Sequence, residues 1–283
     1  MPLKHILGLD HVVVTVGDLD AAAAQWKSLG FTVSPRGTHS PILGTGNYTI
    51  MFGEDYVELL GILTETEQNK PTRDYLAKRE GLERAAFTTD DAAAGAAELK
   101  SRGLAALGPI HFSRPVDLPG GGTDEASFNV FRWPLDQNPG GLRIFACQHL
   151  TRETVWIAEL QSHANGAQRI VRLEVLAADP KAAAEQLSGL IDEPVHTEGD
   201  GWRVPSGGER ADFLFYDAAG FAQRYPEAVR DGAATEGAVA LVLATDNLSR
   251  AKAALGARAI GHDGALSVAA SAANGIVVSF LPQ

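Results

Sequence analysis

The sequence has few of the features that mark disulfide-linked, nucleic-acid-binding or membrane-spanning proteins. Its 283 residues include one cysteine, Cys147, so an internal disulfide is excluded and we expect a reducing compartment. Basic residues are in the minority, and the net charge of −11 disfavours nucleic acid and anionic membranes as partners. No apolar run approaches the roughly 18 residues that a membrane span needs. The N-terminus lacks the apolar core of a signal peptide, so we expect a cytoplasmic protein of bacterial origin.

The composition is that of an ordinary globular protein, with 45% hydrophobic and 21% charged residues. A chain of this length can bury a large core, and its length favours two domains. The polar stretch 151–168 marks the expected boundary. We therefore predict a first module over residues 1–150 and a second over residues 168–283.

A pattern of apolar strand, short polar turn and alanine-rich helix occurs four times. Each turn contains an aspartate, which suits the N-terminus of a helix because its carboxylate accepts hydrogen bonds from free backbone N–H groups. Further strands rich in Val, Ile, Phe and Tyr follow each helix between glycine-rich turns. The sequence thus predicts an α+β protein of four βαβββ units. The four aspartates are Asp18, Asp91, Asp179 and Asp246.

Paired βαβββ units are the pattern of the vicinal oxygen chelate superfamily. Within it, the segments Gly37-Thr38-His39, 43–47 and 56–60 resemble the glyoxalase-like domain family. Phe112-Ser113-Arg114 and Phe131-Arg132-Trp133 resemble the second half of that domain. The resemblance covers about residues 8 to 150, and the rest of the chain matches only as a repeat. It implies two modules with cup-shaped mixed sheets.

The resemblance also implies a metal held by His and Glu side chains from the first and last strands of the units. His11 and Glu58 stand at two such positions. Imidazole with carboxylate suits Fe(II), Mn(II), Zn(II) or Ni(II), with open positions left for substrate oxygens. The alternative is a half-buried core histidine and a solvated glutamate. The strand 56–60 is so apolar, however, that a carboxylate without a specific role is not expected there.

A third ligand is harder to find. In the other units the position of His11 is taken by Arg84, Arg172 and Val239. Arg84 facing the cup would repel a metal but could bind an anionic substrate bidentately, whereas a one-residue slip of register would turn Glu83 inward instead. We take His149 as the candidate third ligand, the alternative being a histidine that merely ends a strand.

Other candidate site residues lie in the first module. His39, in a glycine-flanked turn, could act over the cup mouth as acid, base or ligand, or lie merely exposed. Asn47 could bond a substrate carbonyl or cap its turn. Arg114 and Trp133 could clamp an acidic, partly apolar ligand or stack at the surface. The second module lacks counterparts of His11 and Glu58, so we expect it to complete the fold, close the first cup or mediate a homodimer.

Two functions follow. The first is a metal-dependent enzyme, a lyase, isomerase or dioxygenase, that chelates adjacent oxygens of a small metabolite while Glu58 or His39 moves a proton. The second is a metal-free protein that sequesters a small molecule in the same cup. Ligands converging on one metal would favour the first, and an aromatic-walled cup with Arg84 at its floor would favour the second.

Overall fold

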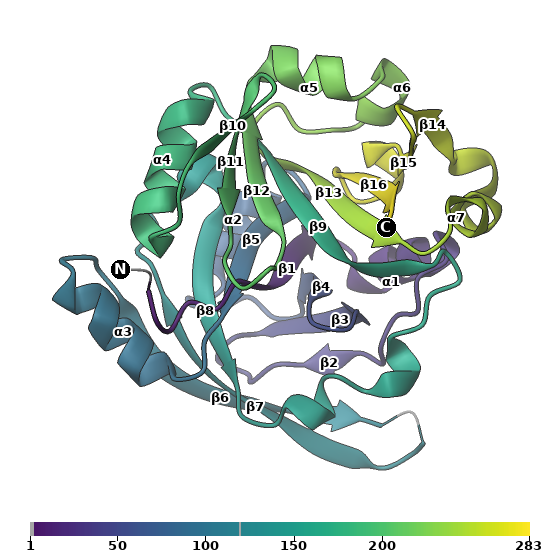
Figure 1. Cartoon of the computed structure of the whole chain (residues 1–283). Helices are drawn as coiled ribbons and strands as arrows, with labels where there is room; N and C mark the ends of the chain where they lie inside the picture. Colours follow the sequence, from purple (N-terminus) through teal and green to yellow (C-terminus); the bar gives the residue numbers. More distant parts are fainter. Residues whose placement is uncertain (1–2, 119) are drawn as a thin grey trace.

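The computed structural model describes residues 3–118 and 120–283; residues 1–2 and 119 of the predicted first module lie outside the described part. In the described part the chain forms two eight-stranded mixed sheets (Figure 1). The strand orders are β2-β3-β4-β1-β5-β8-β7-β6 and β10-β11-β12-β9-β13-β16-β15-β14, so each sheet has the same arrangement of two four-stranded units. The predicted α+β class with four repeated units in two vicinal oxygen chelate modules is confirmed.

The elements have the following bounds. The first sheet contains β1 (Leu9–Val16), β2 (Gly37–Thr38), β3 (Thr45–Met51), β4 (Tyr56–Ile62), β5 (Gly81–Thr88), β6 (Leu107–Asp117), β7 (Thr123–Arg132) and β8 (Arg143–His149). The second contains β9 (Ala167–Leu176), β10 (His196–Glu198), β11 (Gly201–Pro205), β12 (Asp212–Tyr216), β13 (Gly237–Thr245), β14 (Ile260–His262), β15 (Ala265–Val268) and β16 (Val277–Pro282). The helices are α1 (Leu19–Ser28), α2 (Lys70–Leu76), α3 (Ala92–Ser101), α4 (Pro180–Ile191), α5 (Ala218–Arg224), α6 (Glu227–Arg230) and α7 (Leu248–Leu255).

Side-chain caps begin the helix that follows the first strand of each unit. Asp18, Asp91 and Asp179 accept hydrogen bonds from backbone N–H groups of the first turns of α1, α3 and α4. In the fourth unit the cap is Asn247 instead of the expected Asp246. Asp246 pairs with Arg250 at 3.2 Å, and the neighbouring amide oxygen provides the acceptor.

Strand register decides which side chains share a face of the first sheet. On β1, His11 lies opposite Tyr56 and Val13 opposite Glu58 of β4, while Val13 also lies opposite Arg84 of β5. Residues directly opposite on paired strands point to the same side of the sheet. His11, Glu58 and Arg84 therefore lie on one face, which we call the first cup.

A register shift on β5 resolves the question of whether Glu83 or Arg84 turns inward. The pairing of β1 with β5 shifts between Val13 and Val14. An irregularity of this kind lets two consecutive residues of one strand serve the same face. Accordingly the Thr15 hydroxyl, which shares the face of Val13, donates to the Glu83 carboxylate at 2.9 Å, and Arg84 bonds the same carboxylate. Both side chains serve the cup.

The opposite faces of the two sheets share one hydrophobic core. Val12 and Val14 of β1 belong to the same buried cluster as Leu173 of β9. Across the junction, the ring of Phe87 stacks on that of Phe213 with centroids 5.8 Å apart. The two cups therefore face away from each other, and the second module supports the floor of the first cup from behind. Among the described residues, helices long and apolar enough to cross a membrane are absent.

The corresponding face of the second sheet is covered by the chain itself. Helices α5 and α6 lie over this sheet at the top of the view in Figure 1. Phe221, Tyr225 and Val229 from this segment form a buried cluster with Leu214 and Tyr216. Beside them the fully buried Glu174 accepts hydrogen bonds from Arg172 and Tyr216, each at 2.7 Å. The second cup is thus filled by its own side chains.

Candidate functional site

The Glu58 carboxylate lies between two histidines in the first cup. One of its oxygens lies 3.9 Å from Nε2 of His11, and the other lies 4.0 Å from Nε2 of His39. The side-chain amide of Asn47 donates to this second oxygen at 2.6 Å. The Glu58 side chain is 12% exposed, so the carboxylate is sheltered but can still be reached from solvent. His11, His39, Asn47 and Glu58, all predicted from the sequence as site residues, are thus brought together.

Asp10 holds His11 from behind. Its carboxylate accepts hydrogen bonds from Nδ1 of His11 at 2.6 Å, Nε2 of His149 at 2.9 Å and the Thr88 hydroxyl at 3.0 Å. Full burial alone would raise the pKa of Asp10, but the two histidines outweigh burial and hold that pKa well below its usual range. The ionised carboxylate makes Nδ1 of His11 the donor, so in the neutral ring Nε2 carries the lone pair that faces Glu58.

The sequence analysis missed Asp10. The available signal was a carboxylate in a strand whose other residues, His11 and Thr15 apart, are apolar. A buried charge in such a place requires hydrogen-bonding partners.

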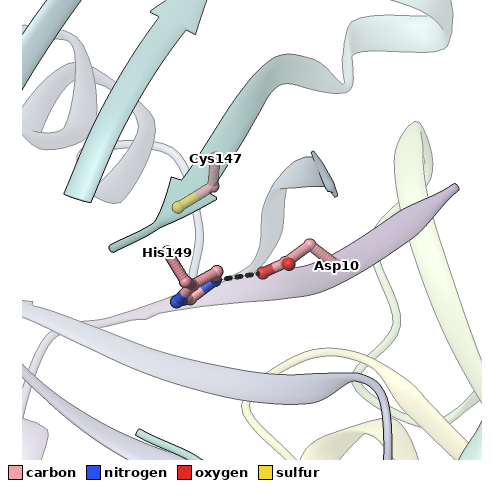
Figure 2. A group of neighbouring side chains, drawn as sticks. All are labelled: Asp10, Cys147 and His149. Carbon is pink, nitrogen blue, oxygen red and sulfur yellow. Dashed lines mark hydrogen bonds and ion pairs between the residues drawn. The ribbon is translucent and has the colours of Figure 1, made fainter. Parts of the chain in front are cut away.

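Asp10, Cys147 and His149 form a second group with the spacing of a metal site (Figure 2). One ligand atom from each lies within 4.8 Å of those of the other two. Burial raises the pKa of the Cys147 thiol well above its ordinary value, and the nearby carboxylates of Asp10 and Glu58 add to this effect. A protonated thiol is a poor ligand, and the Asp10 oxygens are already occupied by three donors. The group can hold an ion only by giving up these hydrogen bonds.

His39 is held in its neutral form. Burial lowers its pKa to about 4, and although Glu58 favours the charged ring, the positive charges of Arg114 and Arg84 lower the pKa further. Its Nδ1 contacts the Thr45 hydroxyl at 2.8 Å, which fixes the ring next to Glu58. At neutral pH His39 is therefore an uncharged ring that can accept a proton from a neighbour and become a cation for as long as it holds that proton.

Aromatic rings line the cup around these polar groups. Tyr56 stacks on the His11 ring at 4.3 Å, and Phe145 meets its edge at 5.4 Å. On the far wall, the rings of Phe112 and Phe128 stack at 5.1 Å. Such walls keep water away from the polar centre.

The remaining predicted residues lie at different depths. Arg84 faces the cup and bonds Thr72 at 2.8 Å as well as Glu83. Arg114 is only 8% exposed and lines a small pocket with Gly37 and Thr49. Burial lowers the pKa of Arg114 and the Glu58 carboxylate counteracts this effect.

Two predicted residues, Trp133 and His149, make their described contacts with groups other than Glu58. Trp133 points to the opposite face, where it packs against Phe87 and Phe131 in the shared core and not beside Arg114. His149 uses Nε2 on Asp10, and its other ring nitrogen has no partner among the described residues.

Comparison with known proteins gives a family and a fold. A family model described as a glyoxalase-like domain matches residues 9–191. A solved structure titled as a hypothetical protein from Staphylococcus aureus has a TM-score of 0.71 at 15% sequence identity, covering 97% of this chain and 99% of that one. This likeness shows a shared fold over nearly the whole chain.

Shorter solved structures match about half of the chain. A variant of Streptomyces coelicolor methylmalonyl-CoA epimerase in complex with 2-nitronate-propionyl-CoA has a TM-score of 0.40 and 20% identity, covering 51% of this chain and 99% of that one. The corresponding values for methylmalonyl-CoA epimerase from Mycobacterium tuberculosis are 0.39, 18%, 52% and 92%. No curated protein matches the chain.

Proposed function

Because the chain belongs to the glyoxalase-like domain family, we propose that its first cup is the active site of an enzyme that acts on a small oxygenated metabolite. The observation that carries this proposal is the Glu58 carboxylate set between the Nε2 atoms of His11 and His39, at 3.9 and 4.0 Å. A sheltered carboxylate between two imidazoles suits the transfer of a proton next to a carbonyl or hydroxyl oxygen.

A divalent metal fits this donor set at His11 and Glu58. The two ligand atoms lie 3.9 Å apart, within reach of a single ion at bond lengths of about 2.1 Å. Asp10 supplies the outer-shell carboxylate that orients a ligating imidazole. Such a metal, of which Fe, Mn, Zn and Ni are the candidates, would supply Lewis-acid chemistry to adjacent substrate oxygens. His149 could join as a third ligand through its unpartnered Nδ1, or through Nε2 by leaving Asp10.

The side chains of the cup divide the proton transfer among them. The Glu58 oxygen near His11 is the ligand atom of this metal site, so the other oxygen, which accepts from Asn47 and faces His39, is the one that would accept a proton from substrate carbon. His39, neutral at pH 7, lies close enough to Glu58 to relay that proton to another position of the substrate. The aromatic walls exclude water that would otherwise quench an enolate.

A second candidate function is the binding of a small molecule without metal or reaction. It is supported by the aromatic walls and by Arg84, which faces the cup two strands away from Glu58. The fold serves either role, because function depends on the site and not on the scaffold.

Elemental analysis of the full chain purified without chelator separates these functions. We expect near-stoichiometric transition metal in the unaltered protein, lost in both His11→Ala and Glu58→Gln and retained in the exposed control His196→Ala. Protein that carries no metal and also fails to bind added Mn(II), Fe(II), Zn(II) and Ni(II) would overturn the enzyme proposal in favour of metal-free binding.

A further inference from the structure

We propose that Arg132, together with Arg84 and Arg143, forms a subsite in the first cup for an oxyanion of the substrate, a carboxylate or phosphate. The subsite deepens the proposed function, since it names the substrate class of the same cup, and it rests on that function only for the reaction that follows binding. Arg132 and Arg143 had no role in the sequence analysis.

Strand register places all three arginines in the first cup. Arg84 of β5 lies opposite Arg143 of β8, in the row of the sheet that also contains Glu58. Arg132 of β7 lies opposite Phe145, whose row leads through Ala86 to His11. The three guanidinium-bearing strands are consecutive in the sheet, in the order β5-β8-β7.

Two of the three arginines, Arg84 and Arg143, share a single carboxylate. Glu83, 1% exposed, accepts hydrogen bonds from Arg84, Arg143 and the Thr15 hydroxyl. Burial alone would raise the pKa of Glu83, but the guanidiniums outweigh it and hold that pKa below its usual range. With one negative charge against three positive charges, this wall of the cup has an excess of cation.

Arg132 is the arginine without a counter-charge. Among the described residues it makes no ion pair, and its Nε is buried without a hydrogen-bond partner. Burial lowers the pKa of Arg132, and the nearby charge of Arg84 lowers it further. An unpaired, half-buried guanidinium beside other guanidiniums is costly, so an arrangement of this kind points to an anion that arrives from outside.

In the second module the chain itself neutralises the corresponding arginines. Arg172, which takes the place of Arg84 in the third unit, bonds Glu174 at 2.7 Å and lies 3.4 Å from Glu198. Arg203 pairs with Glu198 and Asp212. There the chain supplies three carboxylates for two arginines, whereas the wall formed by Arg84, Arg132 and Arg143 contains one carboxylate, Glu83. The unbalanced charge is confined to the first cup.

The spacing sets the size of the substrate. Arg84 and Glu58 lie two strands apart, which is about 10 Å between their backbones, and both side chains reach inward and shorten the gap. A small organic acid or phosphate ester can therefore place its oxyanion on the arginines and a carbon a few bonds away beside Glu58.

Isothermal titration of the chelator-treated full chain with inorganic phosphate and with malonate tests the subsite. At low ionic strength we expect both anions to bind, with affinity reduced at least tenfold in Arg132→Gln and partly restored in Arg132→Lys, which keeps the charge but loses the planar fork. Arg169→Gln, an exposed arginine with the same change of charge, serves as the matched control and should bind like the unaltered protein. The tighter of the two anions identifies the group as carboxylate or phosphate.

Melting curves distinguish binding from a structural role. Without added anion, Arg132→Gln should melt no lower than the unaltered protein, because the change removes repulsion from Arg84 and Arg143. At roughly 100 times its dissociation constant for the unaltered protein, phosphate or malonate should raise the melting temperature of that protein by several degrees and that of Arg132→Gln by at most about half as much. A lower melting temperature without anion, or equal anion binding in both proteins, would overturn the subsite.

The metal and anion tests fail independently. If metal binds at His11 and Glu58 but anion binding does not depend on Arg132, the enzyme proposal stands and the subsite proposal is wrong. Arg132-dependent binding in a chain that takes up no metal supports the subsite and transfers it to the binding function. Glu58→Gln should retain anion binding in either case, because its carboxylate is not part of the subsite.

Discussion

At the scale of single residues, Asp10 determines how His11 can act. A histidine in an apolar strand could present either ring nitrogen to the cup, and the two choices differ in what the cup can bind. The buried carboxylate takes Nδ1 at 2.6 Å and leaves Nε2 for Glu58. The same carboxylate restrains His149, so one charge orders imidazoles from two strands.

Replacing Asp10 should therefore weaken the site without touching a residue that faces the substrate. In Asp10→Asn the amide no longer offers a charged acceptor to His11, and we expect divalent-metal affinity to fall about 10- to 100-fold, as for other outer-shell carboxylates. Titration with Zn(II) or Mn(II) followed by calorimetry measures the change. Thr88→Val removes only the hydroxyl that donates to Asp10 and should change the affinity little. Equal affinities in Asp10→Asn and the unaltered protein would show that His11 is oriented by something else.

The sequence indicates the residues that form a site more readily than the residues that hold them in position. His11 and Glu58 could be paired from the sequence because the resemblance to the glyoxalase-like domain family places ligands at these two positions. Asp10 could not, since its partners His149 and Thr88 come from strands far away in the sequence. The inward turn of both Glu83 and Arg84 depends on a register shift, which alternation of residue types does not reveal.

At the scale of elements, the two sheets differ in what covers their open faces. The first cup is flanked by α2, whose Thr72 bonds Arg84, and is lined in part by Val155 and Trp156 of the connecting stretch, whereas the segment of α5 and α6 fills the second. The repeat pattern gave no sign of this segment, because it lies in the connection between the third and fourth units, as α2 does between the first and second. Its aromatic residues explain why the second module lacks a polar site: Phe221 stacks on Tyr216 at 5.9 Å, where an open cup would hold a ligand.

The difference between the cups predicts unequal costs for similar substitutions. Phe221 is 5% exposed, and Phe221→Ala should cost about 3–4 kcal/mol of unfolding free energy because it leaves a cavity in a filled cup. Phe112 is only partly buried in the first cup, and Phe112→Ala should cost less than about 2 kcal/mol. Urea denaturation followed by circular dichroism measures both changes. Equal losses would mean that the first cup is packed as tightly as the second.

At the scale of the whole molecule, polar contacts fasten the modules around their shared core. The backbone N–H of Leu9 donates to Ser206 at 2.9 Å, and Arg210 bonds the Glu54 carboxylate at 2.7 Å. In the connecting stretch, His163 bonds the backbone of Thr32 and Met51, each at 3.0 Å. The predicted division at residues 1–150 and 168–283 stays a prediction, since a core common to both sheets favours modules that fold together.

Asp55 makes this junction sensitive to pH. Its carboxyl is 2% exposed and accepts from the backbone N–H of Ile170, the second module's first strand, at 3.1 and 3.2 Å. Burial raises the pKa of Asp55 to about 7, although the Ile170 N–H and nearby arginines oppose the rise. Because the folded pKa exceeds the unfolded value of 3.8, the folded chain retains a proton that the unfolded chain loses. The contribution of Asp55 to stability therefore falls as the pH rises towards about 7.

An uncharged isostere should remove this loss. Asp55→Asn keeps an oxygen for the Ile170 N–H, and we expect it to stabilise the chain more at pH 8 than at pH 5, by roughly 2–3 kcal/mol, since the ionised carboxylate is most costly above its folded pKa. Urea denaturation at both pH values gives the difference. Asp136→Asn, an exposed aspartate with the same change of charge, corrects for the general effect of net charge. If Asp55→Asn raised the unfolding free energy equally at both pH values, the effect of Asp55 on stability would come from packing and not from its ionisation. The stability of the junction would then not depend on pH in this range.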